Sequence, residues 1–267
     1  TAGVNYINQF GDNSESFLYP MASLDFTVVK NYFSVFGLFE GDVNKTRLKE
    51  LSFTNPYLNE NILIQNEEVK FNLTGGVKGT LASNVGYKAA VSYKTIGNFH
   101  YFVNDTTRLE TFNVEYEEGN TNILSLVGEL NIQFSKAFRL DGKLELNDYE
   151  LKSQLNAWQY PGIKLTANAG FNIADKLTLN ADLYFQGDSK AKVYSFDTES
   201  GTIPAPVIAN VKTLKAFADF GIGADYQINK NFGAFVRADN LLGNKYQRYL
   251  YYPGFGLNFV GGVSYSF

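Results

Sequence analysis

The chain has 267 residues, of which 45% are hydrophobic, 16% aromatic and 19% charged, and its net charge is −4. It contains no cysteine and a single histidine, His100, which excludes disulfide scaffolds, thiolate nucleophiles, iron–sulfur clusters and multi-histidine metal sites. Lysine and arginine are spread along the chain and the pI is near 5.2, so we expect no nucleic-acid partner. The sequence has no run of about eighteen apolar residues that would predict a transmembrane helix.

Alternation of apolar and polar residues recurs along nearly the whole chain, which is the pattern of strands with two unlike faces. In the segment 1–20, Val4 and Tyr6 keep this spacing, so the N-terminal segment is interpreted as a further or partial strand. The pattern predicts an all-β, antiparallel fold of about twelve strands. The other predicted strands are residues 21–29, 32–44, 69–81, 85–94, 122–134, 138–149, 163–173, 177–187, 213–228, 232–242 and 255–267.

One face of each predicted strand is apolar and free of charge, and the charged residues lie on the other face. On that face, strands 69–81 and 85–94 carry only lysines, whereas strands 21–29 and 32–44 carry only acids. Two interpretations remain open: the charges set up a field across an open lumen, or they pair between strands and lock a filled lumen. The charges assigned to the lumen are Asp25, Glu40, Asp42, Lys70, Lys78, Lys88, Lys94, Glu129, Arg139, Asp141, Lys143, Glu145, Lys164, Asp182, Lys215, Asp219, Asp225, Arg237 and Asp239.

Three features favour a transmembrane barrel over a soluble sandwich. The predicted strands run for about ten residues or more, the length that crosses a bilayer, whereas soluble strands run for about five or six. Tight turns alternate with long connections, and aromatic residues such as Phe134, Phe171 and Phe232 gather beside the tight turns, as in an interfacial girdle. Residues 21–267 are therefore predicted to form a transmembrane β-barrel of the outer-membrane type, either complete in itself or part of a larger barrel.

The long connections are predicted to be extracellular loops, at residues 45–68, 95–121, 150–162, 188–212 and 243–254. In the second loop, Asn98–Val103 and Leu109–Tyr116 are each strand-like, and we interpret them as a hairpin that extends the sheet above the bilayer. Four aromatic residues of the loops are candidate contacts for a ligand or partner, although an outer interfacial belt with loop packing is the more ordinary explanation. They are Trp158, Tyr160, Tyr251 and Tyr252.

His100 lies close to Asp105 in the sequence, a pairing that resembles the acid–histidine couples of surface hydrolases. No nucleophile accompanies the pair, and a lone loop histidine is ordinarily a surface residue. The acid pairs Glu67/Glu68 and Glu117/Glu118 are interpreted as solvated charge, with calcium binding as a lesser option. We therefore expect no enzymatic activity, no cofactor and no metal site.

The end of the chain carries the most specific motif. Residues 235–246 read FVRADNLLGNKY and residues 251–267 read YYPGFGLNFVGGVSYSF. Asn240 to Tyr246, the Tyr-Pro-Gly at 252–254 and the final Phe267 resemble the closing hairpin of TonB-dependent outer-membrane receptors. The resemblance implies a place in the bacterial outer membrane, the lipid bilayer and the barrel-insertion machinery as partners, and recognition of Phe267 by that machinery.

The plug domain and TonB box that drive uptake in that family are not found in these residues, so the resemblance does not imply energised uptake. The predicted function is transport or uptake of small solutes through a polar lumen. The alternative is a barrel that does not transport, but anchors a larger outer-membrane complex through its long loops, with other outer-membrane subunits or a small molecule as the ligand.

Overall fold

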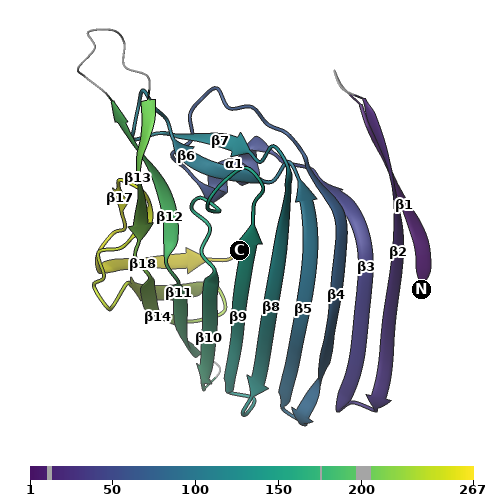
Figure 1. The fold of residues 1–267 in the computed structure, drawn as a ribbon. Coiled ribbons are helices and arrows are strands. Elements are labelled where there is room, and N and C mark those ends of the chain that lie inside the picture. The colour runs from purple at the N-terminus through teal and green to yellow at the C-terminus, as the bar shows by residue number, and fades with distance from the viewer. Residues whose placement is uncertain (11–13, 175, 197–205) are drawn as a thin grey trace.

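The computed structural model describes residues 1–10, 14–174, 176–196 and 206–267. Its main feature is one antiparallel sheet with the strand order β1-β2-β3-β4-β5-β8-β9-β10-β11-β14-β15-β18. Figure 1 shows β2, β3, β4, β5, β8 and β9 side by side in a curved wall, with tight turns at the lower end and long connections at the upper end. The strands are β1 (Ala2–Gln9), β2 (Glu15–Val29), β3 (Phe33–Asn44), β4 (Glu67–Ala82), β5 (Val85–Gly97), β8 (Asn120–Gln133), β9 (Phe138–Glu150), β10 (Ile163–Ile173), β11 (Leu177–Gln186), β14 (Phe217–Gln227), β15 (Phe232–Asp239) and β18 (Asn258–Tyr265).

The long connections contain the remaining elements. These are the short helix α1 (Leu48–Thr54) and three two-stranded sheets. Their strands are β6 (His100–Asn104) with β7 (Phe112–Tyr116), β12 (Ser189–Phe196) with β13 (Pro206–Leu214), and β16 (Gln247–Tyr249) with β17 (Tyr252–Pro253). Within the described ranges, no helix is long and apolar enough to cross a membrane.

The predicted all-β, antiparallel fold of about twelve strands is confirmed. The segment 1–20 contains β1 and the first residues of β2, and these pair with each other from Ala2↔Ala22 to Gln9↔Glu15. In the described part of the chain, β1 and β18 each have one neighbour, so the sheet is open there.

Two predictions about the loop regions were wrong. The β6–β7 hairpin does not extend the main sheet but forms a separate sheet, which crosses over the ends of the strands (Figure 1). The predicted continuous strand 213–228 is broken at residues 215–216, because β13 pairs with β12 in a separate hairpin while β14 joins the main sheet. Periodicity missed the break because Lys215 and Ala216 continue the alternation across it.

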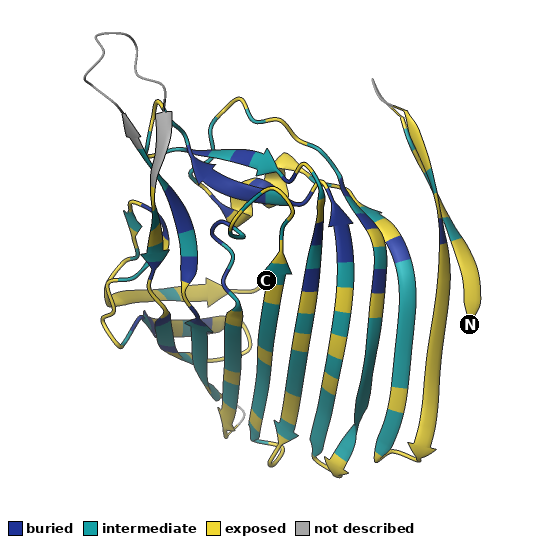
Figure 2. Ribbon diagram, in the orientation of Figure 1, coloured by how far each residue is buried: buried dark blue, intermediate teal, exposed yellow. Residues whose placement is uncertain are grey.

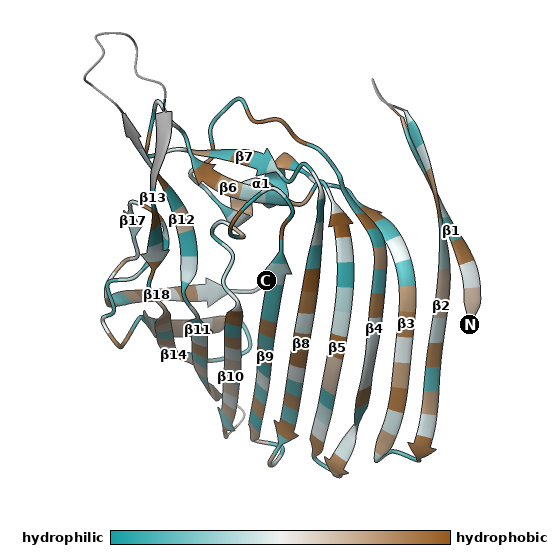
Figure 3. Cartoon of the chain, viewed as in Figure 1, coloured by the Kyte–Doolittle hydropathy of each residue, from teal (hydrophilic) through white to brown (hydrophobic). Residues whose placement is uncertain are grey.

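In the ranges that the structure describes, no protein layer covers the apolar face of the sheet. Leu73, Leu126 and Val236 on this face are 56%, 48% and 54% exposed. Alternating hydrophobic and hydrophilic bands along the strands are visible in Figure 3. A side chain of this kind left in water would cost about 1.5–3 kcal/mol relative to burial, so a face made of many of them requires lipid as its solvent.

Aromatic rings form contacts beside the tight turns of the sheet. The ring centroids of Phe134 and Phe138 are 5.1 Å apart, those of Phe138 and Phe171 6.1 Å, and those of Phe232 and Tyr265 4.7 Å. The first contact lies within the β8–β9 hairpin and the other two join neighbouring strands, as expected of an interfacial girdle.

Buried residues gather at the loop end of the sheet, as Figure 2 shows. One of the two hydrophobic clusters there includes Ile96 and Ile123 from the sheet, with Tyr149 packed against it. These side chains share a face with Lys94, because Lys94 pairs with Ile123, Ile123 pairs with Tyr149, and Ile96 is two residues from Lys94. The loops therefore fold over the polar face of the sheet and leave the apolar face free.

Candidate functional site

The polar face of the main sheet carries the charges that the sequence assigned to a lumen. Strand register brings lysines and acids of different strands together. Lys78 pairs with Lys88 across β4 and β5, and Lys88 pairs with Glu129 across β5 and β8. The ammonium group of Lys78 forms an ion pair with Asp25, and the Nζ atom of Lys88 lies 3.4 Å from Glu129 Oε1. Lys78 and Lys88 are thus each paired with an acid on another strand, Asp25 of β2 and Glu129 of β8.

The acidic strands at the other end of the sheet are balanced in the same way. Arg237 lies between two acids, with its Nη2 atom 3.4 Å from Asp182 Oδ2 and its Nε atom 3.9 Å from Asp239 Oδ1. Asp225 accepts a hydrogen bond of 2.9 Å from the Asn180 side chain. The Lys78–Asp25 and Arg237–Asp182 pairs each span one intervening strand of the wall, and their side chains remain about half exposed. Paired charges therefore line the polar face of the wall, and solvent still reaches them.

The lumen charges near the loop end have different surroundings. Glu40 accepts a hydrogen bond of 3.2 Å from Asn72, and Asp42 accepts one of 2.8 Å from the amide of Val43. A bulge between Val69 and Phe71 shifts the alternation of β4, so Lys70 does not follow Lys78 on the polar face. The Nζ atom of Lys70 lies 3.9 Å from Glu68 Oε2. Lys94 stays on the polar face, opposite Asn72 and Ile123.

Asp219 anchors the motif at residues 240–246 to the wall. Its carboxylate accepts hydrogen bonds of 3.0 Å from the amide of Asn240 and 3.0 Å from the hydroxyl of Tyr246. The Tyr246 ring stacks on Phe217 at a centroid distance of 3.8 Å. Asn240 has a φ of 51°, in the left-handed region that asparagine tolerates, and its amide group donates to the carbonyls of Asn244 and Phe255. The motif thus closes both ends of the last loop.

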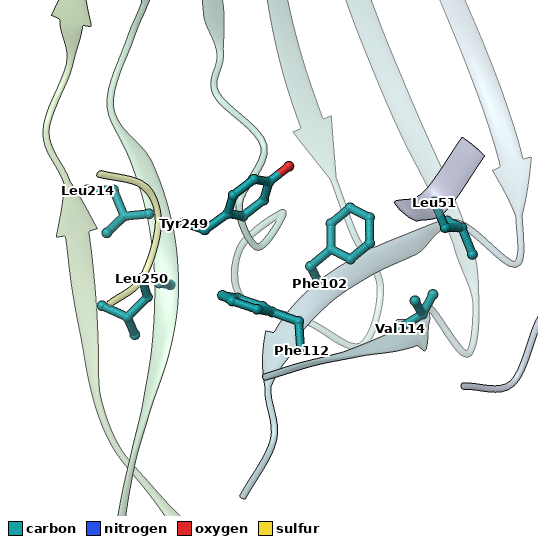
Figure 4. Close-up of a cluster of buried hydrophobic side chains, with 8 residues drawn as sticks. Leu51, Phe102, Phe112, Val114, Leu214, Tyr249 and Leu250 are labelled. Atoms are coloured by element: carbon teal, nitrogen blue, oxygen red, sulfur yellow. The ribbon is translucent and has the colours of Figure 1, made fainter. Parts of the chain in front are cut away.

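Five loop regions pack together above the polar face. We call this unit the loop bundle: residues 45–66, 97–119, 150–162, 187–196 with 206–216, and 240–257. Its core is shown in Figure 4, where Leu51, Phe102, Phe112, Val114, Leu214, Tyr249 and Leu250 converge from these segments. Phe112 and Leu250 are completely buried. Isolated bridges join Leu58 to Phe112 and Trp158 to Lys190, and so connect different loops by backbone pairing.

A buried lysine joins three of these loops. Lys192 of β12 is 6% exposed, and its Nζ atom lies 5.3 Å from the ring centroid of Trp158 and 5.6 Å from that of Tyr101. The same atom lies 3.4 Å from Glu115 Oε2 on β7. Two aromatic faces and one carboxylate therefore replace the water that this ammonium group loses on burial.

His100 is paired with an acid other than the one nearest to it in the sequence. Its Nδ1 atom lies 2.7 Å from Glu67 Oε1, and its backbone amide donates to the same oxygen at 3.1 Å. Tyr160 donates its hydroxyl hydrogen to the carbonyl oxygen of His100 at 3.1 Å. Burial, with a contribution from the Glu67 charge, raises the pKa of Tyr160 well above its ordinary value, so the hydroxyl stays protonated. The group ties the loop bundle to the end of β4.

Asp105 organises a separate polar cavity at the surface of the loop bundle, which the sequence did not reveal. Its Oδ2 atom accepts hydrogen bonds from Asn59 at 2.8 Å and Asn113 at 2.9 Å. Its Oδ1 atom accepts three more, from the hydroxyl and amide of Thr107 and the amide of Arg108. Burial alone raises the pKa of the Asp105 carboxyl, but these hydrogen bonds outweigh it and hold the pKa well below its ordinary value. The cavity has a volume of about 450 Å³.

The four candidate aromatic contacts have unequal positions. Trp158 is buried and Tyr160 packs against Phe99 and Tyr149, so both belong to the interior of the loop bundle. Tyr252 stacks on Tyr57 at a centroid distance of 3.3 Å and donates to the carbonyl of Glu110. Tyr251 is 42% exposed. Contact with a ligand or partner stays a prediction, and of the four it is sterically simplest for Tyr251.

Phe267, the predicted assembly signal, is fully exposed, and its ring lies 5.8 Å from that of Tyr265. Its recognition by the insertion machinery stays a prediction. Within the described ranges, no group of three or more histidine, aspartate or glutamate side chains is placed to hold a metal ion.

No family model and no curated protein sequence matches this chain. Solved structures do match. The siderophore receptor PirA from Acinetobacter baumannii has a TM-score of 0.69 at 13% identity, and the match covers 94% of this chain and 41% of that chain. The ferripyoverdine receptor of the outer membrane of Pseudomonas aeruginosa has a TM-score of 0.68 at 13% identity, covering 99% of this chain and 36% of that one. The copper transporter OprC has a TM-score of 0.63 at 12% identity, covering 96% and 40%.

The fold is thus that of an outer-membrane β-barrel, and it is shared with TonB-dependent receptors, as the terminal motif predicted. The chain spans less than half the length of the solved structures that it resembles. The identities are low, so these matches establish the fold and leave the activity of the chain to be argued from its own residues.

Proposed function

We propose that this chain forms a wall segment and extracellular cover of a bacterial outer-membrane barrel that takes up small solutes, and that it is not an enzyme. The observation that carries the proposal is the loop bundle over the polar face. A face lined by paired, half-exposed charges suits the passage of a hydrated solute. A folded cover at one end of that face is suited to select the solute and to move when it passes.

Support also comes from the neighbours in fold, which are described as siderophore receptors and a copper transporter. The substrate class of this chain is not carried over from them. His100 is engaged with Glu67 and Tyr160 inside the loop bundle, which favours a structural role over a catalytic one.

The test is to lock the cover. These 267 residues contain no cysteine, so a pair introduced as Leu58→Cys and Phe112→Cys, at a bridge between two loops, forms the only disulfide possible within them. Cells that carry the full protein with this pair should lose uptake of a panel of small solutes when oxidised and regain it after reduction. The reduced state of the same variant controls for the altered core. Equal uptake in both states would contradict a moving cover.

The scaffold alternative stays a prediction, and exposed apolar residues at the surface of the loops would carry it. Phe53, Leu155 and Phe255 are 79%, 86% and 90% exposed. Replacing all three with serine should release a bound outer-membrane subunit if the barrel is an anchor, and should leave solute uptake unchanged.

A further inference from the structure

A cavity of about 480 Å³ lies at the loop end of the sheet, between the junction of β13 with β14 and the segment 244–247. Three lysines line it: Lys212 and Lys215 from the junction, and Lys245 from the last loop. All three are exposed, and none forms an ion pair in the part of the chain that the structure describes. Asp188 is held beside the cavity, where its Oδ1 atom accepts a hydrogen bond of 2.6 Å from the amide of Ala216.

The break at residues 215–216 places Lys215 there. The sequence assigned Lys215 to the lumen because it continues the alternation of β14. In the structure the chain changes its partner strand at this point, from β12 to β11, and Lys215 lines the cavity with Lys212. Three like charges line one cavity and have no ion-pair partner in the described part of the chain, so they repel one another, which is unfavourable unless an anion binds.

Part of the cavity lining is apolar. Phe217 and Tyr246 line it from the polar side of the sheet. Phe185 and Ala218 line it from the lipid-facing side and pair directly across β11 and β14. The next pair on the same face is Leu183 with Phe220. The cavity therefore joins a cationic rim to an apolar surface that continues down the outside of the wall.

We propose that this cavity binds the phosphate headgroup of a membrane lipid, with the lysines on the phosphate and the acyl chains along Phe185, Ala218 and the pair below them. The depth is appropriate, because the cavity lies where the strands end and the loops begin, and lysine side chains reach headgroups at this level. A free anion would gain nothing from the apolar lining, whereas a lipid uses both the lysines and this lining. The site is independent of solute transport.

The test uses the purified full chain in a neutral detergent, with native mass spectrometry to measure the affinity for phosphatidic acid and for phosphatidylcholine of the same acyl length. Wild type should prefer phosphatidic acid. The triple variant Lys212→Gln, Lys215→Gln, Lys245→Gln should lose affinity for it by on the order of 100-fold, and keep its affinity for phosphatidylcholine. Heat-modifiable migration on electrophoresis verifies that the variant is folded.

A matched control removes three exposed lysines at the tight-turn end of the sheet, as Lys136→Gln, Lys176→Gln and Lys230→Gln. This variant should bind phosphatidic acid within about twofold of wild type, a smaller change than the loss of one rim charge would give. An equal loss in both triple variants would show a general charge effect and overturn the site. Competition by millimolar inorganic phosphate as effective as that by the lipid would identify a free-phosphate site and overturn the lipid assignment.

Discussion

The sheet wall and the loop bundle are stabilised in different ways. The wall exposes its apolar side chains on one face and half-exposed ion pairs on the other, and it is held by backbone pairing along long strands. The loop bundle buries its apolar side chains as a small soluble domain does, with Phe112 and Leu250 fully enclosed. The same substitution should therefore have different consequences in the two regions, because lipid surrounds one and protein surrounds the other.

The largest effect is expected from a cavity in the loop bundle. Phe112→Ala should lower the free energy of opening of the bundle by about 3–5 kcal/mol, since Phe112 contacts Tyr249 and Tyr252 and no solvent can fill the space. Hydrogen–deuterium exchange of β6 and β7 measures it. Leu126→Ala on the lipid face is the control, and should leave exchange in the wall almost unchanged because detergent or lipid refills the space. Equal effects of Phe112→Ala and Leu126→Ala on exchange would contradict the difference between protein-surrounded and lipid-surrounded side chains.

Charge placed on the lipid face comes next. Leu130→Lys should destabilise the folded barrel by about 2–4 kcal/mol near the bilayer midplane, whereas Asn131→Lys, on the polar face of the same strand, should be milder. Asn131 donates a hydrogen bond to Asp141, so a lysine at position 131 can form an ion pair with that carboxylate. Urea titration in lipid vesicles compares the two. A soluble sandwich would give no such dependence on lipid.

The loop bundle should be sensitive to acid. The folded-state pKa of Asp105 lies below its unfolded value of about 3.9, so the stabilisation is complete above that value and is lost as the pH falls through the folded pKa. Asp105→Ala should cost about 1–3 kcal/mol at pH 7, since five hydrogen bonds to the carboxylate are lost. The rate of proteolysis of the 97–119 loop, measured for wild type and variant between pH 7 and about pH 3, reports both the loss of stability in acid and the cost of the substitution. If the variant kept the acid sensitivity of the wild type, another group would be responsible.

The smallest effect is expected from a wall ion pair. Lys78→Gln should change stability by about 0–1 kcal/mol, because Lys78 and Asp25 are each about half exposed and water replaces the partner. The double variant with Asp25→Asn isolates the coupling in a mutant cycle. A coupling well above about 1 kcal/mol would mean that the lumen is drier than the exposure of this pair indicates.

The sequence alone determined the strands and their two faces. A strand turns successive side chains to opposite faces, so alternation over ten residues is a local property that needs no tertiary information. The sequence also predicted the tight turns and the aromatic girdle, because these too depend on local pattern. The motif at Asn240 to Tyr246 was recognisable for a similar reason, since its side chains form hydrogen bonds within their own hairpin or to the adjacent strand.

Only the tertiary structure decided which charges meet and what the loops do. Asp25 and Lys78 are 53 residues apart, and the strand register brings them together. The pairing of His100 with Glu67 instead of Asp105, the burial of Lys192, and the place of Lys215 in a cavity with Lys212 and Lys245 all arise where segments from different loops pack on one another. Contacts of this kind depend on closing long loops in three dimensions, and no periodicity in the sequence records them.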